Sequence, residues 1–155
     1  MTGASTLAYR RSRFSTRLPL GRRYTAAHYW LDAQEGARFR VGFTKFATRM
    51  LGDLVEYRFE TAPGASIALG QTLGWVEGFK ALSEVYSVVV GDFVGTNPEL
   101  EQDVTLVDSD PYGRGWLYEA RGEADRASVD AQGYVAMLDA TIDKMLEKQK
   151  GQGDA

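Results

Sequence analysis

Residues 74–91 read GWVEGFKALSEVYSVVVG and place a single lysine, Lys80, between two runs of β-forming residues. Trp75 and Val76 precede the lysine, and a run rich in valine follows it, which favours two strands joined by a tight connection. Gly78 lies in that connection, where a residue without a side chain takes a turn conformation at little steric cost. The stretch therefore predicts a β-hairpin that displays Lys80 at its tip, as proteins display a lysine for another enzyme to modify.

The composition excludes several kinds of function. The chain has 155 residues and is 44% apolar, which suits one domain with a hydrophobic core. It contains no cysteine, so a disulfide framework, a thiolate zinc site and a cysteine nucleophile are excluded. With one histidine, His28, it cannot build a multi-histidine metal site, and we expect no metal and no self-sufficient catalysis. No apolar run approaches the roughly 20 residues that span a bilayer, so we expect no membrane partner.

The charge is unevenly distributed along the chain. The net charge is −3, yet residues 1–23 hold six arginines and no acidic residue, while the remainder has 12 basic against 21 acidic residues. An acidic remainder argues against nucleic acid as a partner. The basic segment has three interpretations: a disordered arm, an organellar transit segment, or an ordered extension laid across the acidic part of the chain. The third is favoured by its apolar side chains, which are Leu7, Tyr9, Phe14, Leu18 and Leu20.

Hydrophobic periodicity predicts a β-rich chain with helical flanks. Strands are expected at Tyr24–Leu31, Phe39–Phe43, Asp53–Glu60 and Trp116–Tyr118, in addition to the hairpin around Lys80. Short helices are expected at Thr44–Leu51, with Gly52 placed to end it, and from Glu99 to Val107 after Asn97 and Pro98. The last helix, Ser128–Lys150, has an apolar stripe and a candidate cap in Ser128 or Asp130.

Four segments, in order along the chain, resemble motifs of the glycine cleavage system H protein family. They are YTAAHYW at 24–30, VGFT at 41–44 with LGDLV at 51–55, the hairpin at 77–91, and DPYGRGWL at 110–117. The resemblance implies a mainly β fold, the lipoyl-type barrel-sandwich hybrid of two small sheets, with short helices and a C-terminal α-helix. It divides the chain into a basic N-terminal extension (1–23), a lipoyl-carrier domain of the biotinyl/lipoyl-like type (24–127), and a C-terminal helix and tail (128–155).

The resemblance also implies roles for individual residues. Lys80 would carry covalent lipoate as N6-lipoyllysine, and Glu77 and Gly91 would be read by the lipoyl ligase. Four neighbours would support the hairpin: Gly78, Phe79, Ala81 and Glu84. Six residues would belong to structural motifs: His28, Trp30, Asp110, Tyr112, Gly113 and Trp116. We interpret His28 as a structural histidine rather than a general base, because no nucleophile or orienting acid is recognisable around it.

By the same resemblance, the chain would be a carrier and not an enzyme. It would shuttle an aminomethyl group on lipoyl-Lys80 from a pyridoxal-phosphate glycine decarboxylase to a tetrahydrofolate-dependent aminomethyltransferase. It would then present the reduced arm to the FAD enzyme dihydrolipoamide dehydrogenase, and a lipoyl ligase or lipoyl transferase would attach the arm. We expect a monomer in the bacterial cytoplasm, or in the mitochondrion if residues 1–23 are a transit segment.

Three departures from the family pattern lie near the hairpin. The family usually has serine at the position of Gly78, a small β-branched residue at Phe79 and proline at Val88. These departures leave open an H-like lipoyl carrier of another pathway, such as sulfur oxidation or lipoyl relay. The basic extension leaves open an unmodified interaction module. A biotin carrier is disfavoured, because Phe79 and Ala81 stand where such carriers have methionines.

Overall fold

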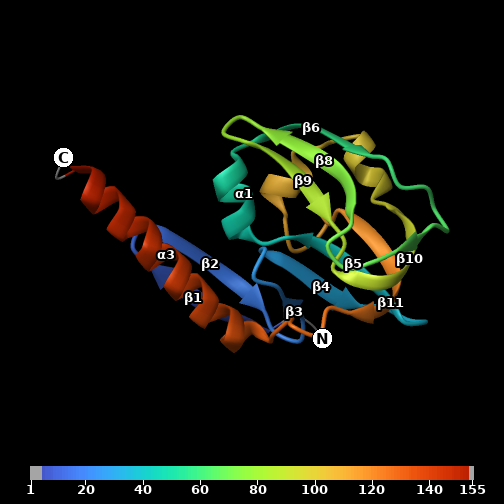
Figure 1. The fold of residues 1–155 in the computed structure, drawn as a ribbon, viewed down its shortest axis with the longest axis horizontal. Coiled ribbons are helices and arrows are strands. Elements are labelled where there is room, and N and C mark those ends of the chain that lie inside the picture. The colour runs from blue at the N-terminus through green and yellow to red at the C-terminus, as the bar shows by residue number, and fades with distance from the viewer. Residues whose placement is uncertain (1–4, 154–155) are drawn as a thin grey trace.

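Two β-sheets face each other across one hydrophobic core and form the body of the molecule (Figure 1). The computed structural model describes residues 5–153. The larger sheet has the strand order β3-β4-β5-β11-β10-β7, and the smaller has the order β6-β8-β9. The strands of the larger sheet are β3 (Arg23–Tyr24), β4 (Tyr29–Ala33), β5 (Arg38–Phe43), β11 (Tyr118–Ala124), β10 (Val89–Thr96) and β7 (Ser66–Ile67). Those of the smaller are β6 (Leu54–Phe59), β8 (Thr72–Gly78) and β9 (Leu82–Tyr86).

The core of this body consists of the inward-facing side chains of both sheets. Leu73, Val76 and Val85 come from the smaller sheet, and Val41 and Tyr118 come from the larger one. In β9, Val85 is buried between exposed Glu84 and Tyr86, which is the period-2 pattern of a sheet with one buried face. The expected mainly β fold of two small sheets with a C-terminal helix is confirmed.

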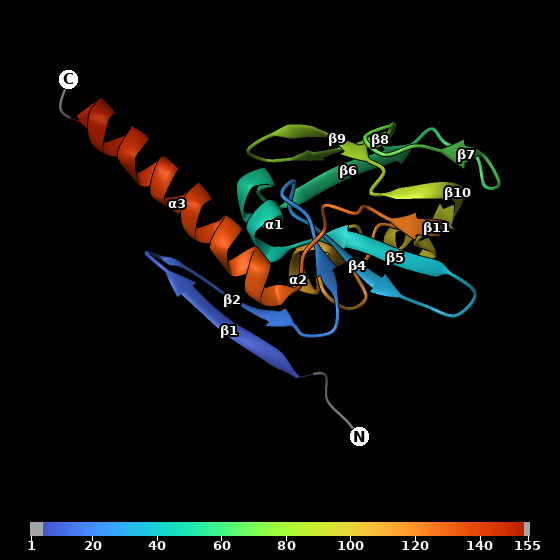
Figure 2. The same cartoon turned by 60° about the horizontal axis from the view of Figure 1, so that its bottom comes forward.

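Residues 6–19 of the basic segment fold as a third sheet outside the body, which we call the N-terminal hairpin. It consists of β1 (Thr6–Arg11) paired antiparallel with β2 (Phe14–Pro19). The hairpin lies alongside the C-terminal helix α3 (Ala131–Gly153), and both extend away from the body (Figure 2). A second core fills the space between hairpin, helix and body, with Phe14, Leu18, Phe46, Tyr134 and Leu138 among its members. Residues 6–19 therefore form an ordered extension, which is the third of the interpretations given for the basic segment.

The predicted strand Tyr24–Leu31 is wrong in its middle. The chain turns at residues 25–28, and β3 pairs antiparallel with β4 instead of continuing into it. His28 has φ 73°, which a strand residue does not adopt. The N–H of His28 donates to the carbonyl of Thr25 at 3.0 Å and closes this turn.

The predicted helix from Glu99 to Val107 is also wrong, because it is two short pieces. A 3₁₀ turn, η1 (Pro98–Glu101), and a short helix, α2 (Leu106–Ser109), are separated by a break at Asp103. The carboxylate of Asp103 accepts the backbone N–H of Thr105 at 3.0 Å. An aspartate that bonds the backbone two residues ahead offers an alternative to the helical hydrogen-bond ladder, which explains the break.

The remaining helices follow the prediction more closely. Helix α1 (Lys45–Leu51) is capped by the Thr44 hydroxyl and ends at Gly52, which has φ 77°. Helix α3 begins at Ala131, and the Asp130 carboxylate accepts the N–H of Gly133 at 2.8 Å, so Asp130 is the cap. Within residues 5–153, no helix is long and apolar enough to cross a membrane.

Strand β11 runs well beyond the predicted segment Trp116–Tyr118. It begins at Tyr118 and continues to Ala124 between β5 and β10. Gly91 of β10 stands directly opposite Gly122 of β11. A Cβ on Gly91 would lie 1.9 Å from the carbonyl oxygen of Arg121, and one on Gly122 would lie 2.0 Å from that of Val90. The two strands approach this closely only because both positions are glycine.

Candidate attachment site

Lys80 lies at the tip of the hairpin that β8 and β9 form, and we call β8, the tip and β9 the attachment hairpin. The N–H of Gly78 donates to the carbonyl of Ala81 at 2.9 Å, which closes the tip. The side chains of Phe79, Lys80 and Ala81 are all exposed. The structure therefore places Lys80 where the sequence predicts it.

The tip is fixed to the end of α1 by its backbone. The N–H of Phe79 donates to the carbonyl of Asp53 at 3.0 Å, and the N–H of Lys80 donates to that of Leu51 at 2.9 Å. These bonds need close approach, and a Cβ on Gly78 would lie 2.2 Å from the Leu51 carbonyl oxygen. Gly52 has positive φ, and its Cβ would lie 3.0 Å from the nitrogen of Lys80. Two glycines thus let the tip rest directly on the turn after α1.

The ammonium group of Lys80 has one hydrogen bond in the structure. Its Nζ donates to the carbonyl of Arg49 in the last turn of α1, at 3.3 Å. No ion pair among residues 5–153 involves Lys80, Glu77 or Glu84. The amine is therefore held in place by weak contacts that an incoming group displaces easily.

Two hollows open at Lys80. The larger, about 690 Å³, runs between α1, the tip of the N-terminal hairpin and the end of α3, with Phe46, Met50 and Met145 in its wall. The smaller, about 390 Å³, lies between Lys80, Phe79 and Asp108. Burial raises the pKa of Asp108, and the nearby charge of Asp53 adds to the rise, although the carboxylate accepts the N–H of Leu54 at 2.7 Å. The lysine thus has an apolar surface on one side and a polar one on the other.

The residues predicted around Lys80 are only partly brought together. Glu77 and Gly78 are in β8 and Glu84 is in β9, so these share the attachment hairpin with Lys80. The Glu84 carboxylate accepts the hydroxyl of Tyr86 at 2.8 Å. Gly91 instead lies in β10 of the other sheet, paired with Gly122 and Ile67. Gly91 therefore lies in a different sheet from the attachment hairpin, although it is close to Lys80 in the sequence.

His28 belongs to a polar chain that joins α3 to the body. Its Nδ1 and the hydroxyl of Tyr134 are 2.8 Å apart, and the same hydroxyl is 2.8 Å from Oγ1 of Thr44. The ring also packs 4.7 Å from that of Phe46, centroid to centroid. Burial lowers the pKa of His28 to about 4. The imidazole is therefore neutral at physiological pH and is partnered by Tyr134.

The loop at Asp110–Trp116 connects the body to the N-terminal hairpin. The indole of Trp30 donates to the carbonyl of Pro111 at 2.9 Å. The hydroxyl of Tyr112 accepts the N–H of Lys45 at 3.0 Å and lies 3.2 Å from Oγ1 of Thr16 in β2. The Asp110 carboxylate accepts the N–H of Arg114 at 2.9 Å, and a Cβ on Gly113 would lie 2.6 Å from it. These residues support the structure around α1 rather than the tip itself.

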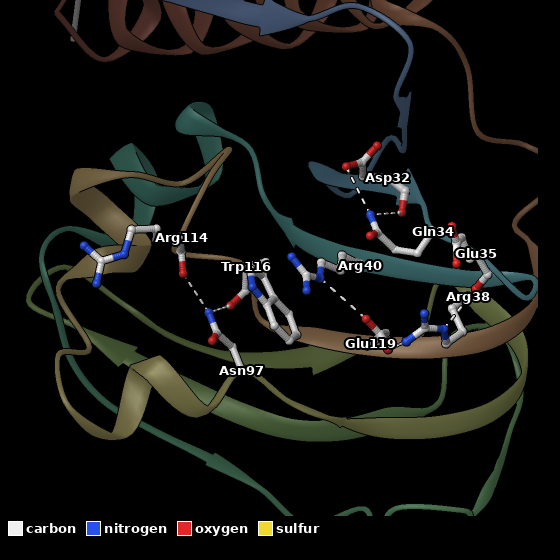
Figure 3. A network of polar contacts seen from close by, with 9 residues as sticks. All are labelled: Asp32, Gln34, Glu35, Arg38, Arg40, Asn97, Arg114, Trp116 and Glu119. Carbon is white, nitrogen blue, oxygen red and sulfur yellow. Dashed lines mark hydrogen bonds and ion pairs between the residues drawn. The ribbon is translucent and has the colours of Figure 1, made fainter. Parts of the chain in front are cut away.

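A polar network holds the far end of the same loop (Figure 3). The amide of Asn97 donates to the carbonyls of Arg114 and Trp116, at 2.7 and 2.8 Å. The guanidinium of Arg40 lies 4.7 Å from the Trp116 ring centroid and 3.5 Å from Glu119. Asn97, which the sequence suggests only as a helix start, therefore also fixes the course of the chain into β11.

Sequence reasoning missed the residues that clamp the tip. The turn Leu51–Asp53 belongs to the LGDLV motif at 51–55, but the motif does not indicate how the tip is held. It is the backbone carbonyls of Leu51 and Asp53 that hold the tip. Carbonyl groups occur at every position of a chain, so no residue pattern marks the ones that will be used. Within residues 5–153, no group of three or more acidic or histidine side chains could hold a metal ion.

The chain is similar to known proteins over most of its length. A family model described as glycine cleavage H-protein matches residues 22–141. The glycine cleavage system H protein of Pseudoalteromonas atlantica is 37% identical over 120 residues, which are 76% of this chain and 92% of that protein. That of Mycolicibacterium smegmatis is 39% identical over 127 residues, or 78% of this chain and 96% of the relative.

A solved structure agrees with the sequence matches. The crystal structure of a glycine cleavage system H protein from Mycobacterium marinum superposes with a TM-score of 0.70 and 33% sequence identity. It covers 78% of this chain and 98% of the solved chain. The family match begins at residue 22, so it includes the attachment hairpin and leaves out β1 and β2.

Proposed function

The chain belongs to the glycine cleavage H-protein family, and from this premise we propose that Lys80 is the residue to which its lipoyl group is attached. The family supplies the lipoyl carrier of glycine cleavage, a carrier component and not an enzyme. One observation carries the assignment to Lys80. Its backbone is clamped by hydrogen bonds to the turn after α1, while its Nζ is exposed and bonded only to the Arg49 carbonyl.

This arrangement suits acylation of the amine. A lysine amine must lose a proton before it attacks an activated acyl carbonyl, and a neighbouring carboxylate would oppose that loss. The nearest acidic residues of the hairpin, Glu77 and Glu84, form no ion pair with Lys80. The fixed backbone holds the base of the Lys80 side chain in one position, which lowers the ordering cost for an enzyme that must recognise the tip.

The residues around Lys80 also fit a lipoyl group. The apolar wall of the larger hollow, with Phe46, Met50 and Met145, is next to Lys80 and matches an aliphatic arm. When bound, the group supplies a dithiolane that exchanges between disulfide and thiol forms. The chain has no cysteine, so none of its own side chains forms a mixed disulfide with those thiols.

The first test is intact-mass analysis of the chain produced with an active lipoylation system. We expect a single lipoyl increment on the wild-type chain and none on Lys80→Arg, which keeps the charge of the side chain but offers no acylatable amine. Peptide mapping should place the increment on the tip peptide. An increment on a different lysine, such as Lys45, would overturn the assignment.

We further propose that the partners are those of glycine cleavage. The carrier would receive an aminomethyl group at glycine decarboxylase, deliver it to the aminomethyltransferase and be reoxidised by dihydrolipoamide dehydrogenase. The support is that the curated relatives are named glycine cleavage system H proteins and match this chain over 92% or more of their own length in the cases above. The test is glycine–bicarbonate exchange with purified glycine decarboxylase, in which the lipoylated chain should support exchange and Lys80→Arg should not.

A second candidate, a lipoyl carrier of another pathway, is favoured by one observation. Phe79 is 80% exposed beside Lys80, at a position where we expect a small residue in the family. A large side chain there changes the surface that every partner meets. Val88, the other departure, is 5% exposed in the core and gives its N–H to Tyr118, so it alters no partner surface. Lipoylation without glycine–bicarbonate exchange would support this second candidate.

A further inference from the structure

A hollow of about 300 Å³ opens on the face of the larger sheet that lies away from the core of the body, beside the loop Asp110–Trp116. Two arginines in its wall lie over tryptophan rings. The guanidinium of Arg22 is 4.4 Å from the ring centroid of Trp30, and that of Arg40 is 4.7 Å from the ring centroid of Trp116. An arginine held over an aromatic ring has a fixed position and still has N–H groups left to donate.

Arg22 is short of hydrogen-bond acceptors. Its Nη1 atom is buried and has no hydrogen-bond partner, and it is the only buried side-chain nitrogen or oxygen in residues 5–153 of which this is true. No ion pair in this part of the chain involves Arg22. A buried charged group without an acceptor is costly, so an acceptor from outside the chain stabilises it. Arg22 therefore marks the hollow as a place where an anionic group binds.

Arg40 has room for a second anionic partner. Its Nε lies 3.5 Å from the carboxylate of Glu119, which is longer than a normal charge-assisted hydrogen bond. The same carboxylate already accepts a bond of 2.9 Å from Arg38. Figure 3 shows Arg40 between Trp116 and Glu119. The guanidinium of Arg40 can therefore donate to a group in the hollow while it stays over the ring of Trp116.

The acidic residues of the wall restrict the kind of anion that fits. The wall contains three arginines and three acidic residues. Two of the acidic residues are bonded to Arg114: Glu99 accepts its guanidinium at 2.7 Å, and Asp110 accepts its backbone N–H at 2.9 Å. The third, Asp32, forms no ion pair among the described residues, and its carboxylate accepts the amide of Gln34 at 3.3 Å. The hollow thus offers one carboxylate without a cation beside the two arginines.

We propose that this hollow binds a free α-amino acid, with its carboxylate bonded to Arg22 and Arg40 and its ammonium bonded to Asp32. Such a molecule carries both charges that the wall leaves unpaired. A nucleotide or another polyanion would meet Asp32 as a like charge, and a simple carboxylate would leave Asp32 without a cation. No residue of this wall lines either hollow at Lys80, so the site is separate from the attachment site and the inference does not rest on the proposed function.

The pairing of the strands keeps the two charges of the site close together. Asp32 of β4 stands directly opposite Arg40 of β5, and the Cβ atoms of such a pair are about 5 Å apart. The two side chains nevertheless form no ion pair, because Arg40 lies over Trp116. A carboxylate and an ammonium attached to the same carbon are close enough to contact both side chains at once.

The experiment is a titration of the unmodified full chain with glycine, followed by NMR through the indole N–H signals of its three tryptophans. The signals of Trp30 and Trp116 should shift together, and that of Trp75, which lies in the smaller sheet, should not. We expect a Kd of about 1 mM, so that the shifts saturate at about 10 mM. Acetate and methylamine carry one charge each and should bind about tenfold more weakly or less, since each lacks one charge-assisted contact. Titrations with the other common amino acids then show which side chains the hollow accepts.

Two substitutions test the assigned contacts. Arg22→Gln should weaken glycine binding about tenfold, because it removes the charge that bonds the carboxylate. Asp32→Asn keeps the shape of the side chain and an acceptor for Gln34, so it should weaken glycine binding about tenfold and leave acetate binding no weaker. The matched control is Arg126→Gln, which removes an exposed arginine outside the hollow and should bind glycine as the wild-type chain does.

Three results would overturn the inference. The first is the absence of a shift at Trp116 with every amino acid. The second is binding of acetate or phosphate as tight as that of the best amino acid, which would make the hollow a plain anion site. The third is unchanged glycine binding in Asp32→Asn. Thermal unfolding of each variant checks that the fold is intact, and the wild-type titrations decide the first two results without any variant. Lipoylation of Lys80 is measured separately, so its failure would leave these results unaffected.

Discussion

The two hairpins that flank α1 are held in place in opposite ways. The attachment hairpin rests on the turn after α1 through backbone hydrogen bonds, from Phe79 to Asp53 and from Lys80 to Leu51. The N-terminal hairpin is held by side chains: the hydroxyl of Tyr9 donates to Asp139 at 2.8 Å, and Arg11 makes two bonds of 2.9 Å to Asp143. The attachment hairpin is thus held by hydrogen bonds between backbone groups, whereas the N-terminal hairpin is held by contacts between its side chains and those of α3.

Backbone contacts and side-chain contacts tolerate different substitutions. The backbone of the attachment hairpin is so close to the turn after α1 that a Cβ would clash there. The hairpin therefore depends on glycine at positions 78 and 52. Side-chain contacts are replaceable one at a time, because each exposed pair contributes little. The family model covers the first hairpin and stops short of the second. In this chain, the hairpin that presents Lys80 therefore depends on the absence of a Cβ at two positions.

The largest expected effect comes from breaking the backbone contact. Gly78→Ala places a Cβ 2.2 Å from the Leu51 carbonyl oxygen, so the tip must move away and lose its bonds to Leu51 and Asp53. We expect a loss of about 2 to 3 kcal/mol in the free energy of unfolding, measured by urea denaturation. Lipoylation should slow at the same time, because the position of Lys80 is no longer fixed.

Gly95→Ala is the matched control for this substitution. A Cβ on Gly95 would meet nothing within 4 Å, and its backbone needs no positive φ. We therefore expect its stability and its lipoylation rate to stay close to those of the wild-type chain. Equal losses in the two variants would show that the close approach at Gly78 is not what fixes the tip.

The next effect concerns the junction between the two regions, where His28 meets Tyr134. The pKa of His28 is about 4 in the folded chain and about 6.5 in an unfolded one. Between these values the unfolded chain binds a proton that the folded chain does not, so stability falls as pH is lowered from 6.5 toward 4. The contribution of neutral His28 to the free energy of unfolding is fully present above pH 6.5. At pH 5 this contribution should be smaller by about 2 kcal/mol.

The measurement is urea denaturation of wild type and His28→Asn at pH 7.5 and pH 5. Asparagine tolerates the positive φ of this position and does not titrate, so it removes the His28 contribution while other groups titrate as before. The wild-type chain should lose more stability on acidification than the variant. An identical loss in both would mean that His28 is not the responsible group.

The smallest expected effect comes from the side-chain contacts of the N-terminal hairpin. Tyr9→Phe removes the hydrogen bond to Asp139 and leaves the packing of the ring on Phe14. We expect a loss of about 1 kcal/mol in the free energy of unfolding and no change in lipoylation. Arg11→Ala should cost less, since both members of its ion pairs are substantially exposed. If Tyr9→Phe lowered the free energy of unfolding as much as Gly78→Ala does, the two hairpins would not differ in the way we propose.

Much of the site was predictable from sequence because its signals are local. A glycine between two β-rich runs predicts a hairpin, and the lysine beside it must then lie at the tip. The apolar stripe of the last helix and the glycine after α1 are signals of the same kind, and each depends only on neighbours in the chain. The predicted strand was wrong at residues 25–28, where one residue has an unusual φ, and the predicted helix was wrong at Asp103, where one side chain causes the break. Neither feature produces a pattern in the sequence.

The sequence by itself determined the fold class, the hairpin that carries Lys80 and the helical end of the chain, because periodicity and turn chemistry act over short stretches. Only the tertiary structure decided that the tip is clamped to the turn after α1, that Gly91 faces Gly122, and that the N-terminal hairpin lies on α3. Each of these joins segments that are distant along the chain, as Tyr9 and Asp139 are at a separation of 130 residues. Such contacts depend on the complementary shapes of two surfaces, and neither segment shows alone which partner it will meet.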